Sequence, residues 1–395
     1  MRKLGVAIVG MGNRSKAHAP LLKIMQDKFE LVAICDGITE RAKAAGATYN
    51  VPWYDNVQQL LVKERPDIVD IVLPPDAHHV VGVLAAEHKV HLMCETPISI
   101  TLPLADAMIN AAQRNGVKFE VAEQVYRWPE ERLKRQIIEA GVIGEPLRVY
   151  CRFRTGAYHA MNALRAYTGW ATPRRVWGAT RSFAVTPFLN FGNPTQEENW
   201  EHALVEFENG VIGIHEQVSN WLSPFRRDLP RNLGVDASKG FIYENDVYVF
   251  ANDGNQRHTM QIETIDVEGM AVPARYKVDT DPPVVWENPY TAYPVGDMDG
   301  IARIDYWHSL YDAIVHNREL NYGALEARKD QELPIAYRES ARQGGLPVEL
   351  PLKAVTAYEE RMHQEYRQKY GSDPLQDLEK LANNVFPQMG IRWAA

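Results

Sequence analysis

Stretches of small apolar and β-branched residues recur through the first 122 residues, and segments with helical spacing separate them. The expected strands are residues 4–9, 31–35, 68–73, 90–94 and 117–122. The expected helices are residues 17–25, 39–47, 79–88 and 104–115. Strands that alternate with helices in this way form a parallel sheet with right-handed crossover connections. The pattern therefore predicts an α/β domain in this part of the chain.

The pattern changes after residue 122, where a second domain is expected to begin. A helix at 130–140 precedes long strand-like stretches at residues 147–153, 175–186, 201–207, 211–218 and 241–250. Consecutive strands joined by turns such as Glu208-Asn209-Gly210 favour an antiparallel sheet. Proline-rich irregular chain at 273–294 then leads to helices at 301–316, 324–343 and 354–370.

Three parts follow from these patterns. Residues 1–122 form the domain with the parallel sheet, and residues 123–350 form an α/β domain with an open, mostly antiparallel sheet. Residues 351–395 form a charged, helical C-terminal tail. An open sheet with one uncovered face is a natural interface between subunits, so we expect a homo-oligomer, either a dimer or a tetramer.

The composition narrows the class of protein. The 395 residues are 45% hydrophobic and 24% charged, which is typical of a globular protein and excludes a disordered, collagen-like or coiled-coil chain. The net charge is −8 and no block of basic residues occurs, so no nucleic-acid partner is expected. No apolar run approaches the roughly 18 residues of a membrane span, and the N-terminal MRKLGVAIVG is interpreted as a strand. Three widely spaced cysteines favour a reducing, cytoplasmic compartment.

A glycine-rich turn follows the first expected strand. Gly10 and Gly12, with Asn13 and Arg14, stand where backbone could approach a pyrophosphate at a helix N-terminus. Such a turn also closes purely structural units, but Asp36 ends the next strand, where a carboxylate can accept hydrogen bonds from ribose hydroxyls. The pair favours NAD over NADP, although the nearby Arg41 keeps NADP open. The alternative for Asp36 is a turn or helix-cap carboxylate.

Several motifs together resemble the glucose–fructose oxidoreductase, inositol dehydrogenase and rhizopine catabolism (Gfo/Idh/MocA) family. The resemblance rests on Val9-Gly10-Met11-Gly12 with His18, Pro75-Asp76-Ala77-His78, Cys94-Glu95-Thr96-Pro97-Ile98, Gly156-Ala157-Tyr158-His159, Asn209-Gly210, Lys239-Gly240 and the segment 322–328. It implies a Rossmann domain, a second α/β domain and an active site in the cleft between them. It further implies NAD(P)-dependent oxidation or reduction of sugars, polyols and their derivatives.

The chain departs from the family pattern at the residues that carry chemistry. The family's usual Glu-Lys-Pro is Glu95-Thr96-Pro97 here, and threonine cannot supply an ammonium group. The usual aspartate before the catalytic histidine is Thr155, and the usual acidic residue after it is Asn162. Of the family's lysine, aspartate and histidine, the histidine alone is retained, as His159.

Oxidation of a secondary alcohol needs a base for the hydroxyl proton, and a histidine titrates in the range that suits this task. His159 is the predicted base, with Tyr158 and Tyr126 as secondary proton donors or orienting groups. Thr96 is predicted to give a hydrogen bond without charge to the substrate or the nicotinamide amide. The alternatives are a structural histidine, ordinary aromatic packing and the end of a strand.

The remaining predicted contacts divide by ligand. The expected cofactor-binding residues are Gly10, Gly12, Asn13, Arg14, Asp36, Pro74, His78, Glu95, Thr96 and Gln124, and the expected substrate-binding residues are Glu123, Arg127, Asn162, Trp200 and His202. Glu123 and Gln124 could equally be solvated hinge residues. Loop arginines Arg226, Arg227 and Arg231 could recognise an anionic substrate, but such arginines are more often solvated. No metal site is expected, because adjacent His78 and His79 lack the spacing that places two imidazoles on one helix face.

Three functions are compatible with these residues. The first is an NAD-dependent oxidoreductase acting on a secondary hydroxyl or keto group of a sugar, polyol or glycoside. The second is an NAD-dependent glycosidase without net redox change, which would proceed by oxidation, elimination, addition and reduction. The third is a nucleotide-binding sensor without turnover, suggested by the missing family lysine.

Overall fold

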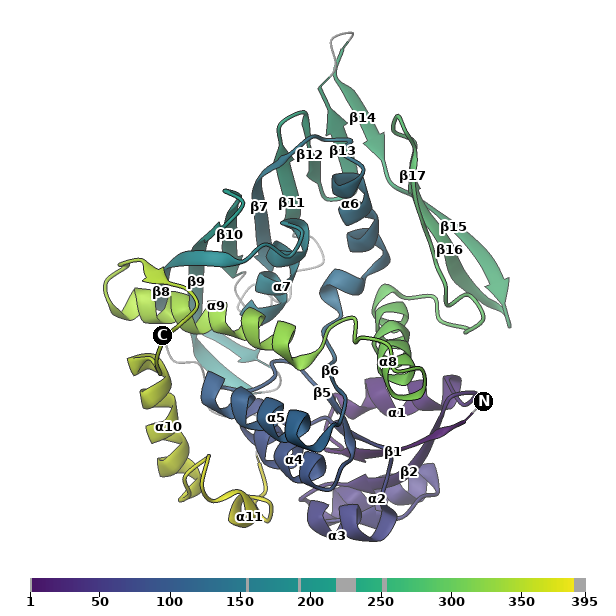
Figure 1. Cartoon of the computed structure of the whole chain (residues 1–395), viewed down its shortest axis with the longest axis vertical. Helices are drawn as coiled ribbons and strands as arrows, with labels where there is room; N and C mark the ends of the chain where they lie inside the picture. The colour runs from purple at the N-terminus through teal and green to yellow at the C-terminus, as the bar shows by residue number, and fades with distance from the viewer. Residues whose placement is uncertain (1, 154–155, 191–192, 218–231, 251–253, 387–395) are drawn as a thin grey trace. The chain divides into compact units, whose positions relative to one another are not determined.

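The computed structural model describes residues 2–153, 156–190, 193–217, 232–250 and 254–386. These residues form two compact units (Figure 1). The first takes in the described residues up to Gln124, Gly300–Gln331 and the described residues from Glu359 onward. The second takes in the described residues of Val125–Asp299 and Glu332–Tyr358. The division read from the sequence placed residues 300–331 in the second domain and residues after 359 in a separate tail, whereas they pack within the first unit.

The first unit is built on a parallel sheet, as predicted. Among the described residues this sheet has six strands in the order β3-β2-β1-β4-β5-β6, so the chain reverses direction across the sheet at β1. The strands are β1 (Leu4–Val9), β2 (Phe29–Cys35), β3 (Trp53–Tyr54), β4 (Ile68–Ile71), β5 (His91–Cys94) and β6 (Phe119–Val121). The helices between them are α1 (Ser15–Ile24), α2 (Thr39–Tyr49), α3 (Val57–Glu64), α4 (Pro75–Glu87) and α5 (Leu102–Asn115). Short β3 and α3 have weak sequence signals and were not predicted.

The central strands of this sheet are buried on both faces, which explains their almost continuous apolar sequences. All four residues of β4 are buried, and Asp70 is the one polar residue among them. Helix α4 is buried along nearly its whole length. Later segments complete the unit: most of α8 (Met298–Val315), α10 (Ala357–Tyr370) and α11 (Leu378–Leu381).

The second unit contains a larger sheet that is mostly antiparallel, as predicted. The described part of it has nine strands in the order β14-β13-β12-β11-β7-β10-β9-β8-β18, and β7 and β10 pair in parallel. Its strands are β7 (Pro146–Phe153), β8 (Pro173–Asn190), β9 (Asn193–Phe207), β10 (Ile212–Gln217), β11 (Asn232–Ala237), β12 (Gly240–Tyr243), β13 (Asp246–Val249), β14 (Gln256–Thr259) and β18 (Val348–Glu349). A separate sheet joins β15 (Gln261–Val267), β16 (Met270–Val278) and β17 (Val284–Glu287).

Helices cover one face of the large sheet. These are α6 (Pro129–Glu139), α7 (Ala157–Tyr167) and the second half of α9 (Ala324–Arg342), and the short helix η1 (Val125–Arg127) precedes α6. A Cβ atom built on Gly213 of β10 would lie 3.4 Å from Leu164 of α7, so the face that carries Gly213 is the covered one. Along β9 the buried residues Ala203 and Val205 share that face.

Two expectations for the second unit were wrong. The stretch 241–250 is not one strand, because Glu244 adopts a left-handed conformation with φ of 53° and the chain turns back between β12 and β13. The proline-rich stretch after residue 273 is not irregular throughout, because it contains much of β16 and all of β17. Pro273 pairs next to a register shift between Glu263 and Thr264, the kind of position at which a sheet tolerates proline.

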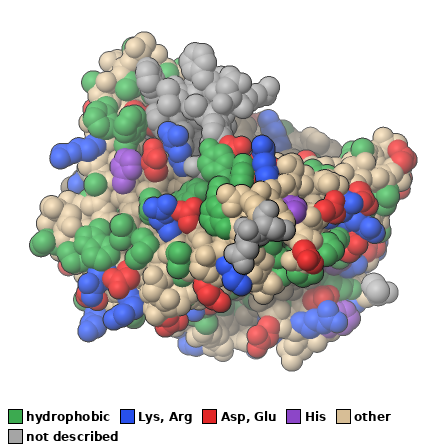
Figure 2. Space-filling model, turned by 90° about the horizontal axis from the view of Figure 1, so that it is seen from above, with side chains coloured by type: hydrophobic (Ala, Val, Ile, Leu, Met, Phe, Trp, Pro, Cys, Tyr) green, Lys and Arg blue, Asp and Glu red, His purple; other side chains and the backbone are tan. Residues whose placement is uncertain are grey.

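None of the described helices is long and apolar enough to cross a membrane. On the face drawn in Figure 2, basic and acidic side chains are interspersed with hydrophobic ones. Three or more His, Cys, Asp or Glu side chains placed to hold a metal ion are not found among the described residues.

Candidate functional site

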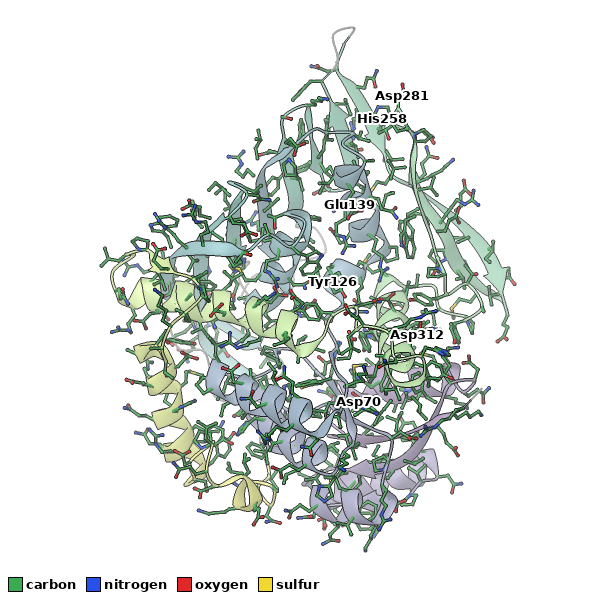
Figure 3. All side chains as sticks on the ribbon, in the orientation of Figure 1. Asp70, Tyr126, Glu139, His258, Asp281 and Asp312 are labelled. Atoms are coloured by element: carbon green, nitrogen blue, oxygen red, sulfur yellow. The ribbon has the colours of Figure 1, made fainter. Side chains whose placement is uncertain are left out.

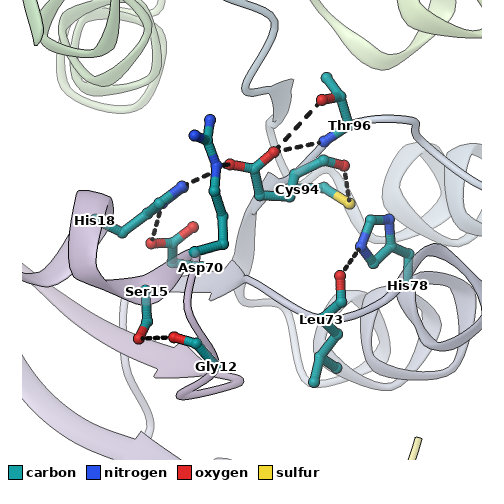
Figure 4. A network of polar contacts seen from close by, with 10 residues as sticks. Gly12, Ser15, His18, Asp70, Leu73, His78, Cys94 and Thr96 are labelled. Carbon is teal, nitrogen blue, oxygen red and sulfur yellow. Dashed lines mark hydrogen bonds and ion pairs between the residues drawn. The ribbon is translucent and has the colours of Figure 1, made fainter. Parts of the chain in front are cut away.

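The glycine-rich turn after β1 is shaped for close approach of a ligand to the backbone. Gly10 has a φ of 104°, and a Cβ atom there would lie 2.3 Å from the carbonyl oxygen of Val72, so only glycine fits. A Cβ atom at Gly12 would meet no atom within 4 Å, which leaves open space beside this backbone. Ser15, in place of the third glycine, donates its hydroxyl to the Gly12 carbonyl at 2.7 Å (Figure 4).

The first turn of α1 begins directly after this open space. Its N-cap residue, Arg14, provides no side-chain cap for the helix N-terminus. Backbone N–H groups at an uncapped helix N-terminus, together with the helix dipole, favour an anion such as a phosphate. The turn and the helix therefore fit the pyrophosphate of a dinucleotide, and Asn13 is an exposed side chain of this turn.

Asp36 ends β2 beside the same turn. Its Oδ2 accepts the backbone N–H of Met11 at 2.7 Å, and its Oδ1 accepts that of Ile38 at 2.9 Å. The guanidinium of Arg41 lies 3.3 Å from Oδ2. The carboxylate thus joins the glycine-rich turn to the start of α2, and it also neutralises the one arginine that the sequence suggested for a 2′-phosphate. Oδ1 accepts one hydrogen bond from Ile38, so its second lone pair can still accept a ribose hydroxyl.

Four charged residues, each linked to the next by a hydrogen bond or ion pair, lie between the glycine-rich turn and the interior of the sheet (Figure 4). Arg14 donates to Oε1 of Glu95, and the same oxygen lies 2.8 Å from Nε2 of His18. Nδ1 of His18 lies 2.9 Å from Oδ2 of Asp70, which is labelled on β4 in Figure 3. His18 and Asp70 are fully buried, so each charge depends on its neighbours for stabilisation.

The charges of these four residues shift the pKa values of His18 and Glu95. Burial alone would lower the pKa of His18, but Asp70 and Glu95 on its two ring nitrogens raise the pKa to about 9. Burial would likewise raise the pKa of Glu95, whereas Arg14 and His18 hold that pKa well below its usual range. His18 is therefore an imidazolium at neutral pH and donates a hydrogen bond to each carboxylate.

Glu95 also holds Thr96 in position. Its second oxygen, Oε2, accepts the Thr96 backbone N–H at 2.9 Å and lies 3.4 Å from the Thr96 hydroxyl. Both Glu95 and His18 are buried, while Thr96 is partly exposed. The sequence predicted Glu95 as a cofactor contact, and the structure places it behind Thr96 and Arg14 as the residue that positions both.

His78 is also a connecting residue. It is completely buried, with Nε2 2.8 Å from the Leu73 carbonyl oxygen and Nδ1 3.0 Å from that of Pro97. The ring thus ties the loop after β4 to the loop after β5, and burial lowers its pKa. Pro74, the N-cap residue of α4, is partly exposed in the first of these loops. His78 and Pro74 were both predicted to contact the cofactor. Of the two, Pro74 is partly exposed and His78 is buried.

The end of β6 supplies a further polar group to the first unit. The side-chain oxygen Oε1 of Gln124 is buried and has no hydrogen-bond partner among the described residues. A buried amide oxygen without a partner is unfavourable unless a ligand or water completes it. Together with the open Gly12 and the uncapped α1, it indicates that the carboxyl edge of the sheet is built to receive a polar ligand.

The predicted proton-transfer residues lie in the second unit. His159 and Asn162 are buried on α7, one helical turn apart on the same side. The ring of Tyr158 lies 4.3 Å from that of His159, and it packs so closely over Gly156 that a Cβ atom there would meet it at 2.6 Å. Helix α7 packs against η1, which carries Tyr126 and Arg127.

Two residues that lie beside Tyr126, namely Arg165 and Trp170, were not predicted from the sequence. The edge of the Tyr126 ring meets Trp170 at 5.4 Å, and the guanidinium of Arg165 lies 5.3 Å over the Trp170 ring. Arg127 lies 5.0 Å over the other partner, Tyr126. The available signal was the spacing on α7, because His159, Asn162 and Arg165 recur every three residues.

Two predicted substrate contacts are not brought to α7. Trp200 and His202 lie on β9, and His202 pairs with Glu216 of β10, on the sheet face opposite to the covered one. Both side chains are exposed. Trp200 and His202 are two residues apart on one strand, so both side chains face the same side of the sheet, and this is the side that α7 does not cover. Thr155 and the arginines Arg226, Arg227 and Arg231 lie outside the described residues.

Glu123 is buried at the end of β6, next to Gln124. The sequence assigned Glu123 to the substrate and Gln124 to the cofactor. Both belong to the described part of the first unit.

Comparison with known proteins finds a family match within the first unit, which is called the nucleotide-binding unit from here on. Residues 4–123 match the family model GFO_IDH_MocA, described as "Oxidoreductase family, NAD-binding Rossmann fold". D-apiose dehydrogenase from Paraburkholderia graminis is 33% identical over 151 residues, which are 38% of this chain and 40% of that protein. D-glucoside 3-dehydrogenase from Escherichia coli is 33% identical over 146 residues, 36% of this chain and 41% of that protein. The match thus spans about two fifths of these curated relatives.

Solved structures extend the likeness to the rest of the chain at the level of the fold. Levoglucosan dehydrogenase in complex with NADH and levoglucosan aligns with a TM-score of 0.67 and 19% identity, over 89% of this chain and 100% of that one. Aldose-aldose oxidoreductase from Caulobacter crescentus aligns with a TM-score of 0.62 and 20% identity, over 88% and 100%. The two-unit architecture is therefore that of these proteins.

Proposed function

We propose that the chain is an NAD-dependent oxidoreductase of the Gfo/Idh/MocA family, acting on a secondary hydroxyl or keto group of a carbohydrate. The observation that carries this proposal is the carboxyl edge of the Rossmann sheet. There the open backbone at Gly12, the uncapped N-terminus of α1 and the carboxylate of Asp36 stand together. These groups match a pyrophosphate and a ribose in charge and in hydrogen bonding.

NAD is the cofactor of this family's Rossmann fold. When bound, it accepts a hydride from an alcohol carbon or returns one to a carbonyl carbon. The Asp36 carboxylate favours the free 2′-hydroxyl of NAD and repels the 2′-phosphate of NADP. Arg41 is held on Asp36 rather than left for a phosphate, which further supports NAD.

His159 supplies the proton transfer in this proposal. Its imidazole takes the hydroxyl proton as hydride leaves the carbon, and it returns a proton in the reverse direction. Tyr158 packs on the His159 ring and limits its rotation. Thr96 gives an uncharged hydrogen bond, held in place through its backbone N–H on Glu95. We further assign Asn162 and Arg127 to the hydroxyl groups of the substrate.

The substrate class is a sugar, a polyol or a glycoside. The curated relatives are named as dehydrogenases of apiose, inositol and glucosides, all of which present several vicinal hydroxyl groups. Buried amide and guanidinium groups such as those of Asn162 and Arg127 suit hydroxyl-rich ligands, because each can form several directed hydrogen bonds.

We also propose that the chain forms a dimer or a tetramer through the uncovered face of the large sheet. This face carries exposed apolar side chains on β8 and β9, and the ring centroids of Phe183 and Trp200 lie 5.0 Å apart there at a tilted angle. Leu204 is exposed on the same face. Exposed apolar patches of this kind often mark subunit interfaces. Sedimentation of the purified protein tests this, and a monomer at micromolar concentration contradicts it.

One specific observation supports a second candidate, an NAD-dependent glycosidase without net redox change. Thr96 stands where the family has a lysine, so the ammonium that assists net dehydrogenation is absent from this position. A cofactor that is reduced and reoxidised within one cycle fits such a change. Its signature is bond cleavage with no accumulation of NADH.

One experiment separates these functions. Purified protein is mixed with NAD and a panel of free sugars, polyols and glycosides, while nicotinamide absorbance and the organic products are followed together. Accumulation of NADH with a keto product supports the dehydrogenase. Release of the aglycone without NADH supports the glycosidase. The absence of any change over the whole panel contradicts both and favours a nucleotide-binding sensor.

A further inference from the structure

The C-terminal residues from 359 to 386 pack along the nucleotide-binding unit. Oε1 of Glu359 accepts the backbone N–H of Leu102 at 2.8 Å, at the start of α5. Nε2 of His363 lies 2.8 Å from the hydroxyl of Thr101. Glu359 is buried, so these contacts fix α10 on the unit rather than leaving it as a loose tail.

The end of α10 reaches the start of α4 (Figure 1). The hydroxyl of Tyr370 donates to Oδ2 of the buried Asp76 at 2.5 Å, and Nζ of Lys369 lies 3.7 Å from the same oxygen. Tyr366 is fully buried and donates to the Asp76 carbonyl at 3.3 Å. Asp76 lies in the first turn of α4, the helix that follows β4 at the carboxyl edge of the sheet.

Beyond α11 the chain crosses to the loops that follow β2 and β3. The side-chain amide of Asn56 donates to Oδ1 of Asn383 at 2.7 Å. A Cβ atom built on Gly37 would lie 3.5 Å from Asn384 O and 3.5 Å from Cγ2 of Val385, so these atoms pack against the glycine. The ring of Phe386 then lies 4.9 Å from that of Tyr370.

These contacts place residues 383–386 beside the adenosine half of the candidate cofactor site. Gly37 directly follows Asp36, the carboxylate assigned to the adenosine ribose. In the sheet, β1 lies between β2 and β4. The C-terminal segment contacts Gly37 after β2 through Asn384 and Val385, and it contacts Asp76 in the first turn of α4 through Tyr370. In an open α/β sheet a dinucleotide binds outside the carboxyl ends of these strands.

Two aliphatic side chains stand exposed at this point. Ile38 is 39% exposed on one side of Gly37, and Val385, which packs on Gly37, is 51% exposed. Solvent-exposed aliphatic groups next to a nucleotide site are suited to a flat, weakly polar ring, because the ring removes their surface from water. The adenine of NAD is such a ring.

We propose that residues 383–386 of the C-terminal segment form part of the cofactor site, with Val385 packing against the adenine of NAD opposite Ile38. This inference rests on the proposed function, since it assumes that NAD binds at the Asp36 edge. It assigns to the segment after α11 a ligand-binding task in addition to its packing on α4.

Substitution of Val385 tests the proposal in the full-length chain. We expect Val385→Ala to weaken the binding of NAD and of ADP-ribose by about three- to tenfold in calorimetric titration, because methyl groups buried by adenine are lost. Leu375→Ala is the matched control, since Leu375 is 42% exposed in the same C-terminal region and lies outside residues 383–386. This control is expected to bind ADP-ribose as the wild-type protein does.

Hydrogen exchange gives a second measurement that does not depend on the variant. Adding ADP-ribose to the wild-type protein is expected to slow amide exchange at residues 383–386. Unchanged exchange there, or equal ADP-ribose affinity of Val385→Ala and wild type, overturns the proposal while the proposed function stands. Tighter binding by Val385→Ala also overturns it, because the segment then excludes adenosine. A wild-type protein that binds neither NAD nor ADP-ribose overturns the proposed function itself.

Discussion

The imidazole of His18 bridges two buried carboxylates, with Nε2 2.8 Å from Oε1 of Glu95 and Nδ1 2.9 Å from Oδ2 of Asp70. Because Glu95 also holds Arg14 and the backbone of Thr96, this bridge connects the sheet interior to the glycine-rich turn and to the loop after β5. The position of the loop after β5 therefore depends on the charge of His18, which is fully buried.

The first prediction concerns stability against pH. The folded-state pKa of His18, about 9, exceeds its unfolded value near 6.5, so the imidazolium stabilises the fold fully below about 6.5. This contribution, on the order of 3 kcal/mol, is lost as pH rises from about 6.5 through about 9. Chemical unfolding of the wild-type protein at a series of pH values is expected to show this decline.

A variant isolates the contribution of His18. His18→Gln removes the titrating group, so its free energy of unfolding should be lower at neutral pH and should lack the decline above about 6.5 that is due to this residue. His202→Gln changes an exposed histidine and serves as the control, with the wild-type profile retained. If His18→Gln keeps the full wild-type decline, the charged bridge is not its origin.

The second prediction concerns the choice between NAD and NADP. Asp36→Ala removes a carboxylate that accepts from Met11 and Ile38, and it releases Arg41. NADH affinity is expected to fall about 10- to 100-fold, the worth of hydrogen bonds to a charged group, while the preference over NADPH narrows or reverses. Fluorescence titration with both nucleotides measures this.

The double variant Asp36→Ala/Arg41→Ala is the control for this assignment. It should lose any gain in NADPH affinity, because the released guanidinium is then absent. An Asp36→Ala protein that retains the wild-type preference would show that Asp36 serves only the turn.

The third prediction concerns proton transfer. His159→Ala is expected to lower turnover by about two to four orders of magnitude, the usual contribution of a general base, with NADH affinity unchanged. Tyr158→Phe keeps the ring that packs on His159 and should lose far less activity. Steady-state kinetics together with NADH titration checks both variants, and wild-type turnover in His159→Ala would refute the assignment.

The fourth prediction concerns the way in which α9 is held on the large sheet. Arg338 of α9 donates two hydrogen bonds to Glu201 of β9, at 2.9 and 2.8 Å, and Tyr337 donates a third. Both charged side chains are buried. Arg338→Met should lower the free energy of unfolding by about 3–5 kcal/mol, because it leaves a buried carboxylate without its cation.

Replacing both partners should be less harmful. Arg338→Met/Glu201→Gln is expected to be more stable than Arg338→Met alone, since no buried charge remains on Glu201. Urea unfolding of the wild type, of Arg338→Met, of Glu201→Gln and of the double variant measures the coupling. Additive losses from the two substitutions would show that the pair does not act as a unit.

Local patterns were sufficient to predict the alternating strands and helices of the nucleotide-binding unit. Strand β1 and the glycine-rich turn follow directly from a small apolar run and Gly10, because few other sequences allow that turn. The charged bridge was not predicted, although Asp70 within a buried apolar strand was a signal. Its partners His18 and Glu95 come from separate elements, and tertiary packing alone brings them together.

The second unit was less predictable for a related reason. A strand sequence does not reveal which of its faces the helices cover, so Trp200 and His202 were grouped with α7 although they lie on the other face. The docking of residues from 359 onward on the first unit depends on Asp76 and Leu102, which lie more than 250 residues away. The periodicity of apolar residues along the sequence does not reveal such contacts.

The central claim is that hydride passes between a carbohydrate carbon and the nicotinamide of NAD. It is tested most directly by incubating the protein with NAD and perdeuterated sugars and polyols, and by measuring deuterium in the recovered cofactor by mass spectrometry. The proposed function predicts deuterium on the nicotinamide ring with at least one compound, and its loss in His159→Ala. A cofactor that stays free of deuterium with every compound, while the protein binds NAD, would contradict the claim.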